Sequence, residues 1–230
     1  KNIGAGTATF KGSILSLGDL GYTERGFVYA TVHNPTIGDS KAIAEGSGTG
    51  EFSATASALV EGNTYYIRAY ATNSKSTVYG EEIEMDYTAV MPVVKTVSIV
   101  SKNIAEGVAT FKGEVVSLGD LACTERGFVY STTNTPTIDN NKVTASGTGT
   151  GTFTATASQL QEGKTYYIRA YVTNKKGTVY AEELTMNYTA GMPEVKTLEV
   201  TNKNIGAGTA TFKGSILSLG DLGYTERGFA

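Results

Sequence analysis

The stretch of sequence that decides the fold reads Leu-Gln-Glu-Gly-Lys-Thr-Tyr-Tyr-Ile-Arg-Ala-Tyr-Val-Thr-Asn over residues 160–174. From Tyr166 onward, one parity carries Tyr, Ile, Ala and Val, and the other carries Tyr, Arg and Tyr. This alternation is typical of a half-buried β-strand, because successive side chains point to opposite faces of a sheet. The following Lys-Lys-Gly favours a hairpin turn, since glycine reaches positive φ without steric cost.

Six further strand-like runs surround this one, and a helical period is absent. Seven short runs in about 100 residues predict an all-β protein built from β-sandwiches. The predicted strands of the central module are 93–100, 107–116, 124–132, 142–146, 151–157, 165–173 and 178–188. The expected core residues are Phe10, Phe27, Tyr29, Leu59, Tyr65, Ile67 and Ala71, with Phe111, Phe128, Tyr130, Leu160, Tyr166, Ile168 and Val172 as their equivalents.

The chain of 230 residues repeats itself at an offset of 101 positions, without insertions. Residues 1–91 and 102–192 are identical at 59 of 91 positions, and residues 1–27 are identical to residues 203–229. The third copy therefore matches the first better than the second, which indicates alternating modules of a longer array.

Two of the four prolines, Pro92 and Pro193, lie at equivalent places after a Met. Proline lacks an N–H group and suits a linker better than a central strand. These positions divide the chain into an Ig-like module that lacks its first strand (1–91), a complete Ig-like module (92–192) and a partial module that holds first strands only (193–230).

The segments Leu59-Val60-Glu61-Gly62-Asn63-Thr64-Tyr65 and 160–166 resemble strands E and F of the fibronectin type III family. The resemblance implies that Tyr65 and Tyr166 form the tyrosine corner of that family. Together with the Gly-Phe-Val-Tyr segment, the modules resemble tandem fibronectin type III-like modules of Bacteroidetes cell-surface proteins, which implies an extracellular location. Tryptophan is absent, so Phe10, Phe111 and Phe212 are expected to fill the space that a core Trp occupies in that family.

Composition excludes several kinds of partner and cofactor. One Cys and one His are too few for a structural zinc site, and a net charge of −3 gives no electrostatic reason to bind nucleic acid. No apolar run approaches the 18 residues of a membrane span. We expect no cofactor, no bound metal and no enzymatic activity, because no nucleophile, metal ligand set or acid pair recurs between copies. A calcium site at a module junction, built from Asp86 or Glu81, stays open.

Several chemical motifs have a simpler structural explanation. The glycine-rich stretches 46–50 and 147–151 lack the Lys-Ser or Lys-Thr and the following helix of a phosphate loop, so we predict a bend before a strand. His33 and Cys123 do not recur, which argues against a thiol–imidazole site in each module. Because the position of Cys123 holds Tyr22 and Tyr224 in the other copies, we expect it to be partly exposed.

The side chains expected on the outer face of strand 165–173, and of its equivalent in the first copy, are the best candidate for a ligand-binding face. It comprises Tyr66, Arg68 and Tyr70 in the first copy and Tyr167, Arg169 and Tyr171 in the second. Aromatic rings can stack on sugars and Arg can add hydrogen bonds, so a glycan or a surface protein is a candidate partner. The competing interpretation is a cross-strand ladder that stabilises the sheet.

Repetition without a recurrent chemical site predicts a structural role. The leading hypothesis is a rigid stalk or fibre segment of a bacterial surface adhesin or filament, with neighbouring copies of the module as partners. One alternative is a filament subunit completed by strand donation between chains, and another is a carbohydrate-binding accessory module that uses the Tyr-Arg-Tyr face.

Overall fold

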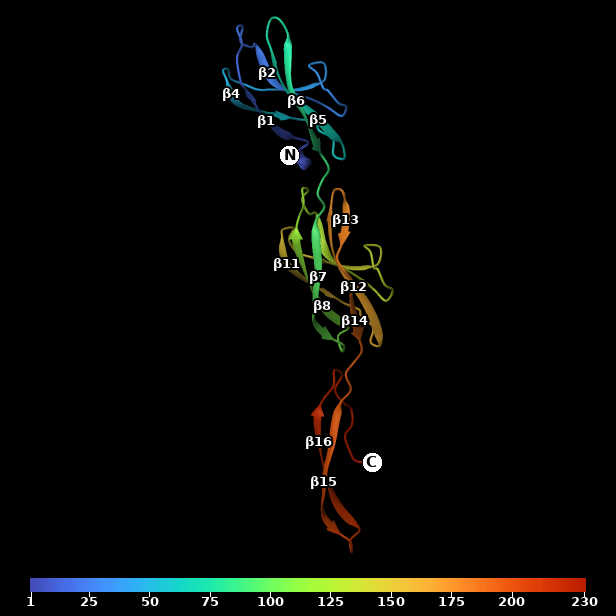
Figure 1. Ribbon diagram of the computed structural model, residues 1–230. Coiled ribbons are helices and arrows are strands. Elements are labelled where there is room, and N and C mark those ends of the chain that lie inside the picture. The colour runs from blue at the N-terminus through green and yellow to red at the C-terminus, as the bar shows by residue number, and fades with distance from the viewer. The chain divides into compact units, whose positions relative to one another are not determined.

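The computed structural model describes residues 1–230, and its regular structure is almost entirely β (Figure 1). The chain forms two compact units. The first unit comprises Lys1–Met91 with Gly119–Ala122, and the second comprises Pro92–Leu118 with Cys123–Ala230. The segment 193–230 therefore lies within the second unit. The chain contains no helix with the length and apolar character needed to span a membrane.

The first unit is a sandwich of two antiparallel sheets. Strands β1 and β4 form one sheet, and the other has the order β3-β2-β5-β6. Their bounds are Ala8–Ile14 for β1, Glu24–Ala30 for β2, Ser40–Ile43 for β3, Gly50–Ala56 for β4, Thr64–Thr72 for β5 and Thr77–Asp86 for β6. A short 3-10 turn, η1 (Ile3–Ala5), precedes β1.

The second unit repeats this sandwich and adds a strand at the edge of the smaller sheet. Its sheets have the orders β11-β8-β7 and β10-β9-β12-β13, with β14 also paired to β12. The strands span Val93–Asn103 (β7), Val108–Ser117 (β8), Glu125–Ser131 (β9), Asn141–Ala145 (β10), Gly151–Ala157 (β11), Lys164–Asn174 (β12), Gly177–Tyr180 (β13) and Leu184–Tyr188 (β14). The all-β, Ig-like sandwich fold predicted from the sequence is confirmed.

The last predicted strand of the central module, 178–188, is interrupted in the structure between β13 and β14. The cause is an irregularity in the pairing with β12, where Ala181 N–H donates to Ala170 O at 2.8 Å between two regular ladders. The first unit has a register shift at the equivalent place, between Arg68 and Tyr70, although β6 continues through it. The module therefore has eight strands rather than seven in its complete form.

Each sandwich is closed by aromatic side chains that meet between its sheets. Phe111 on β8 lies 5.6 Å from Phe128 on β9, measured between ring centroids, and Phe10 and Phe27 repeat this edge contact at 5.6 Å. All the expected core residues of the two sandwiches are buried except Ala71, which is partly buried. Burial of these rings supplies the hydrophobic stabilisation of each unit.

The segment after Pro193 forms an antiparallel hairpin of β15 (Glu194–Asn204) and β16 (Thr209–Ser218). Phe212 on β16 is 54% exposed, whereas its equivalent Phe111 is fully buried, so the expectation that Phe212 fills a core is wrong for this segment. The reason is that the residues around Phe212 include no second sheet like the one that covers Phe111.

Strand β1 pairs only with β4, whereas β8 pairs with both β7 and β11. Donation of a strand from another chain to β1 stays a prediction, because nothing in these intramolecular pairings tests it.

Candidate functional site

The Tyr-Arg-Tyr candidates lie on β5 and β12, the central strands of the larger sheets. Tyr65 and Ile67 point into the first sandwich and are buried, so Tyr66 and Arg68 project from the opposite face, where both are partly buried. The alternation of the sequence therefore places the candidate face on the outer side of the sheet, as two-residue periodicity requires.

Tyr70 and Tyr171 do not offer exposed rings on this face. Their exposed fractions are 2% and 0%, which corrects the expectation of an outward, accessible Tyr at each position. Register explains the burial, because Tyr171 lies opposite Gly127 on β9, and Tyr70 lies opposite Gly26 on β2. Because glycine has no side chain, it leaves room for the Tyr ring beside the neighbouring strand.

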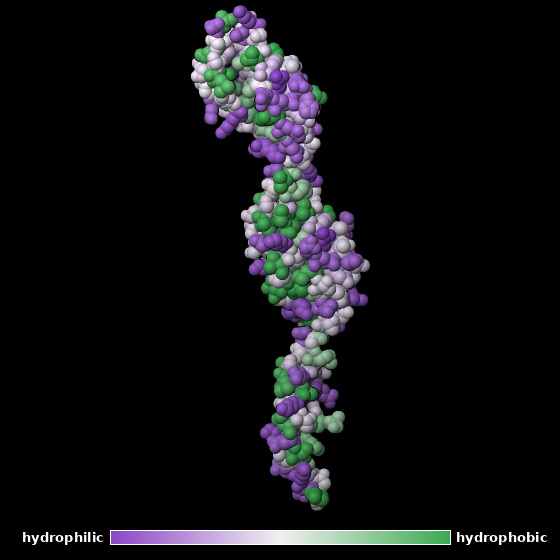
Figure 2. Space-filling model, in the orientation of Figure 1, coloured by the Kyte–Doolittle hydropathy of each residue, from purple (hydrophilic) through white to green (hydrophobic).

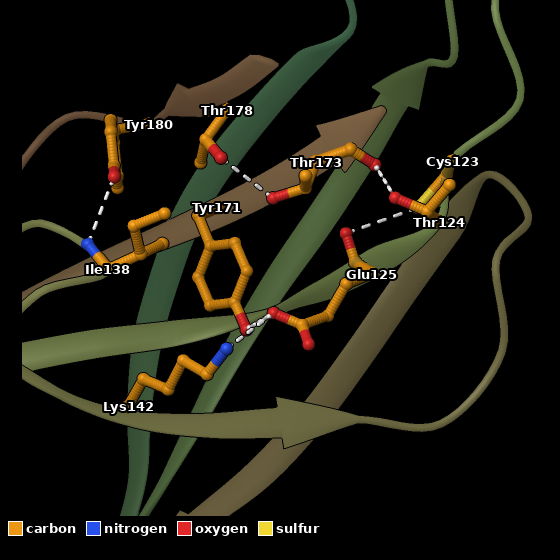
Figure 3. A network of polar contacts seen from close by, with 9 residues as sticks. All are labelled: Cys123, Thr124, Glu125, Ile138, Lys142, Tyr171, Thr173, Thr178 and Tyr180. Carbon is orange, nitrogen blue, oxygen red and sulfur yellow. Dashed lines mark hydrogen bonds and ion pairs between the residues drawn. The ribbon is translucent and has the colours of Figure 1, made fainter. Parts of the chain in front are cut away.

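A polar network then fixes the buried ring (Figure 3). The Tyr171 hydroxyl donates a hydrogen bond to Glu125 Oε1 at 2.7 Å, and Lys142 Nζ contacts the same oxygen at 3.0 Å. The Tyr171 bond, followed by the Lys142 contact, holds the pKa of Glu125 below its usual range. Burial, followed by the bond to Glu125, raises the pKa of Tyr171.

The first unit contains the same network in Tyr70, Glu24 and Lys41. The Tyr70 hydroxyl donates to Glu24 Oε1 at 2.5 Å, and Lys41 Nζ lies 3.0 Å from that oxygen. This network was not predicted from the sequence, although Thr-Glu-Arg-Gly-Phe recurs in all three copies. This recurrence is the feature of the sequence that could have indicated a role for the Glu. In the structure the Glu of this motif accepts the hydrogen bond of the buried Tyr, as Glu24 and Glu125 show.

The buried phenol makes stability depend on alkaline pH. Because the folded-state pKa of Tyr171 is raised above its unfolded value of about 10, its contribution is fully present below pH 10 and is lost as the pH rises toward the folded pKa. We expect Tyr171→Phe to reduce the fall in unfolding free energy of the second unit above pH 10, by up to about 1.4 kcal/mol per pH unit. Urea denaturation between pH 8 and 11.5 measures this slope. The control is Tyr167→Phe, whose hydroxyl makes no hydrogen bond within the chain, and equal slopes for the two variants would contradict the prediction.

The two Arg residues of the candidate face are also engaged within their own modules. The Arg68 guanidinium lies 4.5 Å from the centroid of the Tyr79 ring, and its Nε donates to Gly80 O at 3.1 Å. Arg169 repeats both contacts, at 4.8 Å from the Tyr180 ring and 2.9 Å from Ala181 O. These contacts hold β6 against β5 in the first unit and β13 against β12 in the second. They agree with the interpretation of the Tyr-Arg-Tyr pattern as a cross-strand ladder that stabilises the sheet.

The remaining rings, Tyr66 and Tyr167, differ between the copies. His33 stacks on Tyr66 at 3.8 Å between ring centroids, and its Nδ1 lies 2.7 Å from Glu82 Oε1. Asn134 replaces His33 in the second copy, so the ring of Tyr167 has no such cover. Glycan binding through this face stays a prediction. The burial of Tyr70 and Tyr171 and the stacking of His33 on Tyr66 leave Tyr167 as the one ring of the candidate face that is neither buried nor covered by His33.

Tyr65 and Tyr166 connect the start of their strands to the preceding turn. Val60 N–H donates to the Tyr65 hydroxyl at 2.9 Å, and Gln161 N–H donates to the Tyr166 hydroxyl at 2.9 Å. In both cases the phenol bonds to backbone five residues upstream, which is the geometry that defines a tyrosine corner.

The glycine-rich stretches turn their carbonyl groups, rather than their N–H groups, toward a charged partner. Arg126 Nη1 donates to Gly149 O at 2.8 Å and Nη2 donates to Ser146 O at 2.7 Å. Arg25 makes the equivalent bonds to Gly48 and Glu45. An anion needs donors, so this loop is a clamp for an internal Arg and not a phosphate cradle.

Cys123 is 6% exposed and packs in the core of the second unit, so the expectation of partial exposure is wrong. The equivalent Tyr22 is only partly buried and its hydroxyl reaches Gly48 O at 3.0 Å, because a long side chain at this position extends out to the glycine-rich loop. Burial raises the pKa of the Cys123 thiol, which makes it a poor nucleophile. No group of three or more His, Cys, Asp and Glu side chains gathers as a metal site would require.

A hollow of about 1130 Å³ lies along the hairpin of β15 and β16 and includes Phe212, Ile216 and Phe229 in its lining. In the complete sandwich the equivalents of the first two, Phe111 and Val115, are covered by the second sheet. Figure 2 shows hydrophobic residues on the surface of this segment. The hollow is therefore the inner face of a sandwich layer and not a shaped ligand pocket.

No protein-family model matches the chain, and no curated protein matches its sequence. Among solved structures, the chain is similar to the FN1–FN3 domains of chicken CNTN1, with a TM-score of 0.33 and 11% identity. The similarity covers 72% of this chain and 56% of that one, so the chain spans little more than half the length of the structure it matches. A likeness of this degree carries no argument about function, and the β-sandwich fold is established by the strand order itself.

Proposed function

We propose that the chain is a structural segment of an extracellular stalk or fibre on a bacterial surface, in which tandem sandwiches extend the reach of another part of the protein. The observation that carries this proposal is the internal use of the repeated polar residues. Glu125, Arg126 and Arg169, like their equivalents in the first copy, bond to groups of their own module. Recurrent side chains that make such contacts stabilise the module itself. Further copies of a stable module lengthen the protein without requiring a new fold.

Short connections after each of the two sandwiches support the same role. Strand β6 ends at Asp86 and β7 begins at Val93, which leaves the six residues 87–92 between them. Strand β14 ends at Tyr188 and β15 begins at Glu194, which leaves the five residues 189–193. Connections of this length that contain a proline have little conformational freedom compared with a flexible linker.

Small-angle X-ray scattering of the full chain tests the proposal. A stalk segment predicts a pair-distance distribution with a distinct shoulder at the spacing of one module, roughly 30–35 Å from the length of its strands. The matched control has a linker of six residues, alternating Gly and Ser, inserted between Met91 and Pro92. This flexible linker should broaden the shoulder. An unmodified chain whose distribution is as broad as that of the control would contradict a stiff segment.

A further inference from the structure

The sequence Ser-Leu-Gly-Asp-Leu occurs three times, at residues 16–20, 117–121 and 218–222. In the second and third copies its serine is the last residue of β8 or β16, so the loop leaves the smaller sheet at one end of the sandwich. None of the candidate sites described above uses these residues.

In the first unit, Asp120 of this loop binds the backbone of Val90 through two hydrogen bonds. Asp120 N–H donates to Val90 O at 3.0 Å, and Val90 N–H donates to Asp120 Oδ2 at 2.8 Å. Both residues belong to the first unit, which comprises Lys1–Met91 with Gly119–Ala122. Next to this pair, Leu121 packs against the hydrophobic core cluster of the same unit.

The second unit repeats the pair at the equivalent positions. Asp221 N–H donates to Gly191 O at 3.0 Å, and Gly191 N–H donates to Asp221 Oδ2 at 2.6 Å. Gly191 has no side chain where Val90 has an isopropyl group, yet the two bonds are the same. The loop therefore recognises the backbone of a segment that follows the last strand of a sandwich, whatever side chain that segment carries.

The glycine of the loop is required by this close approach. Gly119 and Gly220 have φ angles of +68° and +67°, and a Cβ atom at either position would lie 2.0 or 2.3 Å from the bound carbonyl oxygen. Such distances are far inside van der Waals contact, so any larger residue would displace the bound backbone. Left-handed φ values add a second reason for glycine.

The first copy of the loop has the same conformation without a bound segment. Gly18 has a φ of +61°, and its N–H donates to Ser16 Oγ at 3.2 Å, as Gly220 N–H donates to Ser218 Oγ at 3.2 Å. Nothing lies within 4 Å of a Cβ built on Gly18. The site is thus preorganised, which lowers the entropic cost of binding.

The side chains of Leu17, Asp19 and Leu20 in this first loop are exposed. Leu17 and Leu20 are 42% and 55% exposed, and Asp19 makes no hydrogen bond within the chain. A preformed loop that presents a free carboxylate, a free N–H group and two leucines matches the surface that is occupied at Asp120.

We propose that residues 16–20 are a docking site for a second copy of this module, which binds through the backbone of its own residue equivalent to Val90 or Gly191. The partner is a folded sandwich rather than a free peptide, because Leu121 packs against a folded core where the site is occupied. This inference rests on the proposed function in one respect, since a tandem array is what places such a copy before Lys1.

The test extends the full chain by fusing residues 92–202 directly before Lys1. The added residues contain the complete core of the second sandwich, and residues 203–229 are identical to residues 1–27, so the new junction has the sequence of an existing one. Amide hydrogen exchange of Asp19, measured by NMR in the extended and unextended chains, reports the docking. Docking predicts that exchange at Asp19 slows at least about tenfold on extension, to a rate near that of Asp120, which corresponds to about 1.4 kcal/mol. Equal rates at Asp19 in both chains would overturn the proposal.

Two variants separate docking from general stabilisation of the loop. Gly18→Ala should abolish the protection of Asp19 in the extended chain, because its Cβ would collide with the docked carbonyl. Gly21→Ala is the matched control, since Gly21 has the same φ of +61° and equally open surroundings. If both variants or neither variant lost the protection, the contact would not be the one proposed. If the docking proposal fails in this test, the scattering test of the stalk is unaffected. Hydrogen exchange measures the protection of one loop, whereas scattering measures the spacing of the modules.

Discussion

Replacing Phe111 with alanine is expected to lower the free energy of unfolding of the second unit by about 3–5 kcal/mol. The ring is fully buried and lies 5.6 Å from Phe128 and 6.1 Å from Tyr130 between centroids, so its removal leaves a cavity between the two sheets. A loss of this size is a large part of the total stability of about 5–15 kcal/mol that a domain has. Urea denaturation, with hydrogen exchange of β8 and β9 to assign the transition, measures it.

The chain contains its own control for this substitution. Phe212 occupies the equivalent position in the third copy, within the identical run Thr-Phe-Lys-Gly, but it is 54% exposed. Phe212→Ala should change the unfolding free energy by well under about 1 kcal/mol, because surface side chains contribute little. Similar losses for the two variants would mean that Phe212 is covered in solution, and a small loss for Phe111 would contradict the packing of the sandwich.

The comparison of these two residues shows what periodicity can and cannot predict. Alternation in the sequence assigned Phe111 and Phe212 to the same inward face, and it also predicted β11 with the bounds found in the structure, Gly151–Ala157. Whether an inward face is covered depends on a second sheet. The local pattern of a strand carries no information about that sheet, so alternation alone could not separate the burial of Phe111 from the exposure of Phe212. The division of the chain, which gave 193–230 first strands only, is the feature of the sequence that separates them.

The burial of Tyr171 could not be predicted from the sequence for a related reason. Periodicity placed Tyr171 on the outer side of β12, but its burial depends on which residue of β9 lies opposite. That residue is Gly127, and the pairing is a property of strand register rather than of either strand alone. The case of Cys123 is different, because Tyr22 and Cys123 share a backbone position while the longer side chain extends out to a loop that the shorter one does not reach.

Replacing Gly127 with alanine tests how closely the neighbouring β10 and the Tyr171 ring pack against this glycine. A Cβ atom at Gly127 would lie 2.2 Å from Val143 O and 2.9 Å from Thr144 Cα on the neighbouring strand, and 3.1 Å from Cε1 of Tyr171. Relief requires β9 and β10 to separate or the Tyr171 ring to leave Glu125. Overpacking of this kind typically costs about 1–3 kcal/mol and occasionally more, and we expect the upper end because two of the three contacts are with backbone.

The matched control is Gly149→Ala, since a Cβ atom at Gly149 would meet nothing within 4 Å and its φ is not left-handed. Its carbonyl still accepts the hydrogen bond from Arg126, and the loss of backbone freedom in the unfolded chain should leave stability unchanged or raise it by about 0.4–1 kcal/mol.

Gly26→Ala provides an independent repeat in the first unit, because its Cβ would lie 2.3 Å from Ala42 O. Losses at Gly127 and Gly26, with faster exchange of the β10 and β3 amides and no loss at Gly149, are the expected pattern. Equal behaviour of Gly127 and Gly149 would contradict the close approach of the β10 backbone to Gly127.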